Sequence, residues 1–256
     1  MPDWDHQLYL KFSDQRARSA ADLIAQIQIE NPPRIIDLGC GTGNSTAQLH
    51  RRWPQAQLTG LDSSPAMLAQ ARDDHPDWQW MESAIEDWKP QGTYDLVFSN
   101  AALHWVPDHA ALFPRLFRAV APGGALAVQM PNNFFAPAHL GMKRVAADPT
   151  WAGALASASE KIFIQPVAFY YHALRTFAGN LNIWETEYLQ IMDGHKAVLD
   201  WMRSTAMRAY LEGLDNDDQR RCFEEQCLAE FEKSYPADEQ GKVLFPYKRM
   251  FIVAYR

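Results

Sequence analysis

The sequence has few cysteines, no surplus of positive charge and no long apolar run. Three Cys among 256 residues cannot form the disulfide framework of a small secreted domain, so we expect reduced, non-catalytic thiols. The 24 Lys and Arg are outnumbered by 31 Asp and Glu, which disfavours binding to nucleic acid. No apolar stretch reaches the roughly 18–20 residues that span a bilayer, and residues 1–14 contain no apolar signal region. We expect a cytoplasmic protein without a membrane or nucleic-acid partner.

Metal-ligand spacing is also missing. Cys40 lies in a glycine-rich turn, and Cys222 and Cys227 are five residues apart on a predicted helix, which is not the spacing of a metal-ligand pair, so we expect no metal site. The composition itself is globular, with 47% hydrophobic and 21% charged residues, which excludes a disordered chain.

Short apolar runs alternate with helical patterns over the first 130 residues. This rhythm is typical of an α/β fold, and we predict a doubly wound, seven-stranded, mostly parallel sheet. The predicted strands here are 34–38, 58–61, 78–81, 94–99 and 125–130, with helices near 45–52, 65–73 and 109–120.

The flanking segments complete the predicted domain. A helical segment within residues 1–31 precedes the first strand, and its helix is expected near 14–29. Residues 132–180 mix Pro, Gly and aromatic residues and predict a helical insertion that caps the carboxyl edge of the sheet. Strands are predicted at 183–191 and 244–255, and helices at 195–204 and 218–235. We therefore predict one domain, residues 1–256.

A glycine-rich turn follows the first strand, in the order Asp37-x-Gly39-x-Gly41-x-Gly43. Glycines leave the backbone N–H groups uncovered, so a ligand can approach the turn closely. Asp62 ends the next strand, about 20 residues on, where a carboxylate can accept hydrogen bonds from a ribose diol. The turn predicts a nucleotide-like ligand, and a tight turn without a ligand is the alternative.

The spacing distinguishes between two cofactors. A dinucleotide fingerprint requires Gly-x-Gly-x-x-Gly with a pyrophosphate at the helix N-terminus, whereas here the third glycine comes one residue early and position 44 is Asn. The carboxylate of Asp37 would repel a pyrophosphate but suits a cationic amino-acid group. The turn therefore favours S-adenosylmethionine over NAD.

The first 130 residues resemble the class I S-adenosylmethionine-dependent methyltransferases. Residues 61–68 resemble the second motif of that superfamily, which implies that Asp62 binds the ribose and Met67 packs near the adenine. Ala84 stands where relatives commonly carry an Asp that binds the adenine amino group, so Glu82, Ser83, a backbone carbonyl or apolar contact would replace it. The implied cofactor-binding residues are Asp37, Gly39, Gly41, Asp62, Ser63, Met67, Ser83, Ala84, Ile85 and Asn100.

A narrower resemblance extends over nearly the whole chain. Five segments in order are similar to the bacterial trans-aconitate 2-methyltransferase family: 3–5 with 16–18, 100–106, 131–133, 183–188 and 200–205. The resemblance implies transfer of a methyl group from S-adenosylmethionine to a carboxylate of trans-aconitate or a related small polycarboxylate. The products would be a monomethyl ester and S-adenosylhomocysteine.

This chemistry needs no catalytic residue. A carboxylate with an ordinary pKa near ~4 is already ionised at pH 7, so the protein has to orient it and exclude water. Arg is the natural partner because its fork matches carboxylate geometry, and His104 with Trp105 is expected to form a pocket wall. The predicted substrate-binding residues are Arg16, His104, Trp105, Asn132, Trp184, Tyr188 and Arg203. Surface charge and ordinary core packing are the alternatives for these side chains.

Two other functions remain open. A carboxyl methyltransferase that acts on a malonyl group held by a carrier protein would need an exposed basic patch, which this acidic chain does not suggest. A regulatory protein that binds S-adenosylmethionine without catalysis is disfavoured because Asp37, Asp62 and the three glycines are all present. We expect a monomer or weak dimer with a small-molecule substrate.

Overall fold

A computed structural model describes residues 13–156, 158 and 162–256, with side chains from residue 17 onward. Backbone contacts divide the protein into two compact units. The sheet unit contains residues 16–131, 162–186 and 249–256, and the helical unit is the rest of the described chain. The predicted division into one domain with a cap at 132–180 stays a prediction.

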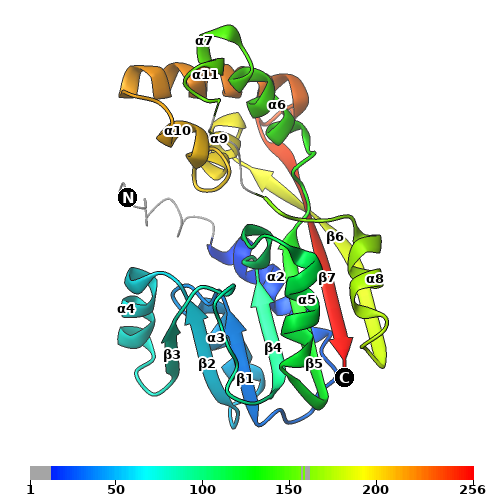
Figure 1. Ribbon diagram of the computed structural model, residues 1–256. Coiled ribbons are helices and arrows are strands. Elements are labelled where there is room, and N and C mark those ends of the chain that lie inside the picture. Colours follow the sequence, from blue (N-terminus) through cyan, green and yellow to red (C-terminus); the bar gives the residue numbers. More distant parts are fainter. Residues whose placement is uncertain (1–12, 157, 159–161) are drawn as a thin grey trace. The chain divides into compact units, whose positions relative to one another are not determined.

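Seven strands form one sheet in the order β3-β2-β1-β4-β5-β7-β6 (Figure 1). The pairs β1–β2, β1–β4, β2–β3 and β4–β5 are parallel, so these five strands end at one carboxyl edge, and β7 is antiparallel to β5. The strands are β1 Arg34–Leu38, β2 Gln57–Asp62, β3 Gln79–Glu82, β4 Tyr94–Asn100, β5 Val120–Pro131, β6 Asn180–Met192 and β7 Val243–Tyr255.

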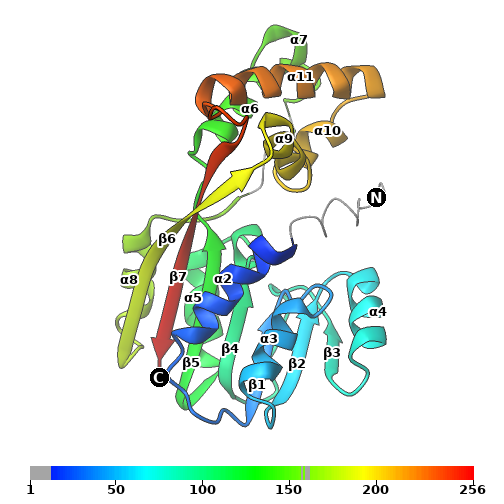
Figure 2. The same ribbon diagram turned by 180° about the vertical axis from the view of Figure 1, so that it is seen from behind.

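Helices cover both faces of the sheet unit. Figure 2 shows α2 (Ser13–Ala25) and α3 (Asn44–Arg52) against one face, and Figure 1 shows α5 (His109–Arg118) against the other. α4 (Pro65–Asp74) begins where the Ser64 hydroxyl accepts the Met67 N–H, with Pro65 in the first turn. Such N-caps satisfy otherwise unpaired helix N–H groups, so α4 starts directly after β2.

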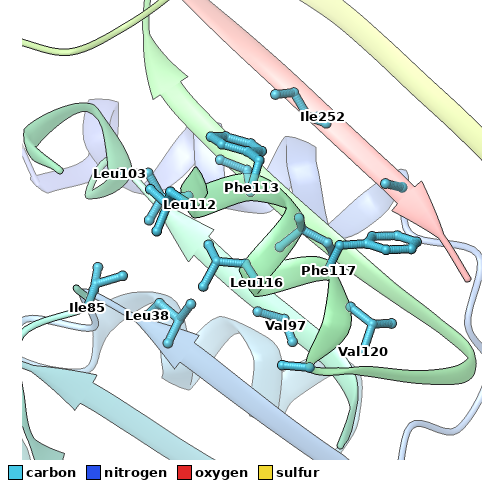
Figure 3. Close-up of a cluster of buried hydrophobic side chains, with 14 of the residues drawn as sticks. Leu38, Ile85, Val97, Leu103, Leu112, Phe113, Leu116, Phe117, Val120 and Ile252 are labelled. Atoms are coloured by element: carbon cyan, nitrogen blue, oxygen red, sulfur yellow. The ribbon is translucent and has the colours of Figure 1, made fainter. Parts of the chain in front are cut away.

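The apolar face of α5 forms the core shown in Figure 3. Its Leu112, Phe113 and Leu116 are at most 3% exposed and belong to one cluster with Leu38 of β1 and Val97 of β4. Burying such a side chain contributes about 1.5–3 kcal/mol each, so this packing holds β1 and β4 side by side. The glycine-rich turn follows β1, and the short segment with His104 and Trp105 follows β4, so this packing brings both segments to the same edge of the sheet.

The helical unit has its own core. Trp201, Phe223, Phe231 and Phe245 are almost completely buried there, and α11 packs on α6 and α9. Its helices are α6 Pro137–Ala146, α7 Pro149–Ala152, α9 His195–Arg203, α10 Arg208–Glu212 and α11 Asp217–Ser234, whereas α8 Val167–Leu174 packs beside α5 in the sheet unit.

The predicted doubly wound, seven-stranded fold is confirmed, and each predicted strand overlaps an observed one; β3 begins at Gln79, one residue later than predicted. β5 is the strand whose start differs most, because it begins at Val120 instead of residue 125. Val120 pairs with Tyr94 before the ladder register shifts between Tyr94 and Leu96. Such an irregularity lets pairing continue past Pro122 and Gly123, where a sequence pattern indicates a turn.

Candidate active site

The glycine-rich turn combines close packing with one open position. Gly39 and Gly41 both have positive φ, +75° and +56°, which L-residues with a Cβ rarely adopt. A Cβ on Gly39 would lie 2.2 Å from the Ala102 Cβ, whereas a Cβ on Gly41 would have no atom within 4 Å among the described residues. Gly39 is therefore required by packing, and Gly41 leaves space that a ligand can occupy.

Asp37 is buried beside this turn and has one unused oxygen. Its Oδ2 accepts hydrogen bonds of 2.7 Å from Ser45 Oγ and from Thr46 Oγ1. Its Oδ1 is buried without a hydrogen-bond partner in the described part of the chain. Burial, opposed by the two hydroxyls and assisted by the negative charge of Asp62, raises the pKa of Asp37 to about 6. An unpaired buried carboxylate oxygen is costly, so it fits a cationic ligand group.

Asp62 joins the glycine turn to the start of α4. Its Oδ2 accepts the Gly41 N–H and its Oδ1 accepts the Ser64 N–H, both at 2.9 Å, so its carboxylate is held in one orientation. A carboxylate has about four acceptor positions, so both oxygens can still accept hydrogen bonds from a diol. Ser63 lies between Asp62 and the N-cap in the same turn.

The segment after β3 is held by an arginine from α5. Arg115 donates hydrogen bonds of 2.8 Å to the carbonyls of Ile85 and Trp88. The Ser83 hydroxyl donates to the Ala84 carbonyl at 3.0 Å. Ile85 is buried, and its Cδ1 lies 3.7 Å from the position of a Cβ on Gly39. This arrangement places an apolar side chain and backbone polar groups next to the glycine turn.

The chain turns sharply where β4 ends. Ala101 has a φ of +54°, which is strained for a residue with a Cβ, and its N–H donates to the Gln129 carbonyl at 2.9 Å. Ser19 Oγ of α2 donates to Asn100 Oδ1 at 3.4 Å. The strained turn directs the chain into the short helix η1 (Leu103–Trp105) at the carboxyl edge.

His104 and Trp105 form η1 together with Leu103. The two rings lie 4.6 Å apart between centroids, His104 is buried, and Trp105 is 52% exposed. Burial above all, then the positive charge of Arg249 and the neighbouring His109 ring, lowers the pKa of His104 to about 3. The imidazole is therefore neutral throughout the physiological range and does not act as a proton acceptor that titrates near pH 6.5.

A buried hydrogen-bond chain holds η1 in place. His109 Nε2 lies 2.9 Å from the Leu103 carbonyl, so it is the protonated nitrogen, and Nδ1 then accepts from the Tyr170 hydroxyl at 2.7 Å. The Tyr170 oxygen accepts the Gln165 N–H at 2.9 Å. This chain connects α5, α8 and η1, and burial lowers the pKa of His109, which favours the neutral ring that these contacts require.

Comparisons with known proteins agree with this geometry. Residues 35–124 match the family model described as a methyltransferase domain. Two curated proteins named trans-aconitate 2-methyltransferase align with the entire chain. The one from Azoarcus sp. (strain BH72) is 43% identical over all of both chains, and the one from Methylobacterium nodulans is 44% identical over 99% of its own length.

The chain belongs to the trans-aconitate 2-methyltransferase family. The resemblance of the sequence is thereby confirmed. A solved structure, the YcgJ protein from Bacillus subtilis, has a TM-score of 0.59 and 12% identity, and the match covers 93% of this chain and 98% of that one. At this identity the likeness establishes a shared fold alone.

The substrate-binding residues predicted for this trans-aconitate 2-methyltransferase family member divide between the two units. His104, Trp105 and Trp184 belong to the sheet unit, and Asn132, Tyr188 and Arg203 to the helical unit. Their roles stay predictions, as do those of the cofactor residues.

Several of these side chains have defined contacts. Trp184 stacks on Phe251 at 4.9 Å between ring centroids, and Arg203 Nε lies 2.9 Å from Glu224 Oε1. The side chain of Arg16, like residues 3–5 of the N-terminal motif, lies outside the described residues.

Two buried polar side chains of this family member are not predicted by the sequence pattern. Gln129 and Arg249 are 0% and 4% exposed and lie on β5 and β7. Both fall in apolar runs that predict core strands, and such a run gives no indication of a site residue. One feature of the sequence does point to Arg249: it directly precedes the apolar run 250–254. Arg is almost never fully buried without a partner, so an arginine next to a core strand indicates a polar contact there.

None of the described helices is long and apolar enough to cross a membrane. Nor does the described part of the chain contain a group of three or more His, Cys, Asp or Glu placed to hold a metal ion.

Proposed function

We propose that this protein transfers a methyl group from S-adenosylmethionine to one carboxylate of trans-aconitate or a related small polycarboxylate. The products are a monomethyl ester and S-adenosylhomocysteine. The full-length relatives that carry this activity in their names support the proposal. The observation that carries it is the buried, unused Oδ1 of Asp37 beside the open face of Gly41, because this pair fits a cationic ligand with a close approach to the backbone.

The residues present fit the cofactor. Asp37 Oδ1 accepts from the ammonium group, Gly41 leaves room for the chain of the ligand, and Asp62 accepts the ribose hydroxyls. When bound, S-adenosylmethionine supplies a methyl group activated by a sulfonium. The remaining proposed contacts come from the turn, from the segment after β3 and from the end of β4: Gly39, Ser63, Met67, Ser83, Ala84, Ile85 and Asn100.

The protein orients the substrate and removes water from it. A carboxylate is ionised at pH 7 and requires no base, so no side chain serves as a catalytic nucleophile or proton acceptor. Within the sheet unit, neutral His104 donates a hydrogen bond to the substrate, and Trp105 and Trp184 line it. Arg16 supplies positive charge that compensates for the desolvation of the carboxylates.

The turnover number is expected to stay nearly constant between roughly pH 6 and 8.5 at saturating S-adenosylmethionine. The substrate carboxylate is ionised throughout that range, and the pKa of His104, about 3, keeps its ring neutral. Initial rates in overlapping buffers measure the profile. A fall in kcat toward acid with a midpoint near 6.5, lost in His104→Ala, would instead identify an enzyme base.

A transfer assay tests the function directly. The protein is incubated with methyl-labelled S-adenosylmethionine and a panel of di- and tricarboxylates, or with a malonyl-loaded carrier protein, and volatile label is counted after alkaline hydrolysis of the ester. We expect base-labile label with trans-aconitate. Label only on a malonyl group of a carrier protein would favour the carrier-protein enzyme, and binding of S-adenosylmethionine without transfer to any acid would favour a regulatory protein.

We also propose a cytoplasmic monomer or weak dimer. All three cysteines are free thiols, and burial raises the pKa of Cys40 and Cys227 and so keeps both protonated. Sedimentation equilibrium of the purified chain measures the mass, and a stable tetramer would contradict this part of the proposal.

A further inference from the structure

Arg249 is a buried cation within the sheet unit. Its side chain is 4% exposed, and its Nη1 donates to Gln129 Oε1 at 3.4 Å. A guanidinium carries several N–H donors in a fixed fork, and its attraction for an anion is stronger in the protein interior than in water. A cation at such a position is a candidate for anion recognition if other donors point to the same place.

Gln129 supplies such a donor. Its side chain is completely buried, and its Nε2 has no hydrogen-bond partner among the residues that the structure describes. Because Oε1 already accepts from Arg249, the amide is oriented with its NH₂ group unused. An unused NH₂ next to a guanidinium presents donors to an oxyanion, and a carboxylate has the oxygens that can accept from both.

The pair lies at the functional edge of the sheet. Gln129 is directly opposite Asn100 of β4, and Arg249 is opposite Pro131, the last residue of β5. Gln129 is also opposite Phe251, which is two residues from Arg249 and so shares its face, and Phe251 stacks on Trp184. The charge of Arg249 acts on His104 in η1. The donors therefore adjoin the end of β4 in the same unit.

We propose that Arg249 and Gln129 together bind one carboxylate of the acid substrate. Arg249 offers the planar fork that matches a carboxylate, and Gln129 fixes the orientation of the fork and adds a neutral donor. The subsite rests on the proposed function for the identity of its ligand, a small polycarboxylate. It also gives a reason for a glutamine and an arginine in strands that are otherwise apolar.

Direct titration tests the subsite apart from catalysis. Trans-aconitate is titrated calorimetrically into the full chain saturated with S-adenosylhomocysteine, and S-adenosylmethionine is titrated separately. Arg249→Lys keeps the charge but loses the fork, and we expect trans-aconitate to bind at least about tenfold more weakly while S-adenosylmethionine affinity changes less than twofold. Arg34→Lys is the control, because Arg34 begins β1 at the opposite edge and donates to the Thr93 carbonyl.

The variant Gln129→Glu distinguishes carboxylate binding by Arg249 from a purely structural role of this arginine. A glutamate would pair with Arg249 inside the protein and stabilise a purely structural arginine, whereas it would repel an incoming carboxylate. We expect a melting temperature at or above that of the wild type together with loss of trans-aconitate binding. Wild-type affinity for trans-aconitate in both Arg249→Lys and Gln129→Glu would overturn the subsite.

The outcomes for subsite and function are distinct. Arg249-dependent binding without ester formation by the wild type would retain the subsite and reject the methyltransferase proposal. Ester formation with an unchanged KM for trans-aconitate in both variants would retain the methyltransferase proposal and reject the subsite. Absence of any binding of trans-aconitate to the wild-type complex would reject the subsite.

Discussion

Gly41→Ala is expected to weaken S-adenosylmethionine binding about ten- to a hundredfold while the protein stays folded. The new Cβ would contact no described residue within 4 Å, so it would instead enter the space assigned to the ligand. Inserting a methyl group into a closely packed contact typically costs about 1–3 kcal/mol, which corresponds to that loss of affinity. Calorimetric titration with S-adenosylmethionine measures the effect, and thermal melting checks the fold.

Gly123→Ala is the matched control. Gly123 has a φ of +79°, and a Cβ there also meets nothing within 4 Å among the described residues, but it lies near the start of β5, away from the carboxyl edge of the sheet. Both variants carry the same backbone penalty of about 1–2 kcal/mol in stability. Gly39→Ala should lower the melting temperature more than either, because its Cβ would lie 2.2 Å from Ala102. Equal cofactor affinity in Gly41→Ala and Gly123→Ala would remove Gly41 from the site.

Asp37→Asn is expected to reduce S-adenosylmethionine affinity by a factor of about 100 or more. The change preserves the shape of the side chain and an oxygen for Ser45 and Thr46, but removes the negative charge opposite the ammonium group. Removing one partner of a buried charge pair costs about 3–5 kcal/mol. Asp95→Asn is the control, since Asp95 accepts the Arg34 N–H at the opposite edge of the sheet. Unchanged affinity in folded Asp37→Asn would rule out the proposed contact.

The protonation of Asp37 determines how the affinity for S-adenosylmethionine is expected to depend on pH. The pKa of Asp37 is raised to about 6 in the free protein, so the side chain is protonated below that pH and must lose its proton to pair with a cation. Apparent affinity should therefore fall as pH decreases below about 6, by up to roughly tenfold per pH unit, and level off above it. Asp37→Asn should flatten this dependence between pH 5 and 7. A wild-type affinity independent of pH over that window would contradict the assignment.

Local patterns were sufficient for the fold class and for the cofactor turn. The residues 35, 36 and 38 of β1 form an apolar run buried on both faces, which is how a central parallel strand differs from a half-exposed one. Asp37 and the glycines are contiguous with that strand, and Asp62 ends the next one. The chemistry of that motif depends on neighbours in the chain, so it could be predicted without the structure.

Contacts between residues far apart in the sequence determine the roles of the individual glycines and the pKa of His104. Gly39 and Gly41 have equivalent positions in the motif, and only the approach of Ala102 makes one a packing requirement and leaves the other open. Likewise, a histidine in sequence has an ordinary pKa, whereas burial and Arg249 make His104 neutral.

Gln129 and Arg249 are 120 residues apart and meet because β7 runs antiparallel to β5. A sequence pattern reports which face of a strand is apolar, but the pKa of a group and the convergence of donors depend on desolvation and on strand order. Both of these arise only when segments far apart in the chain pack together.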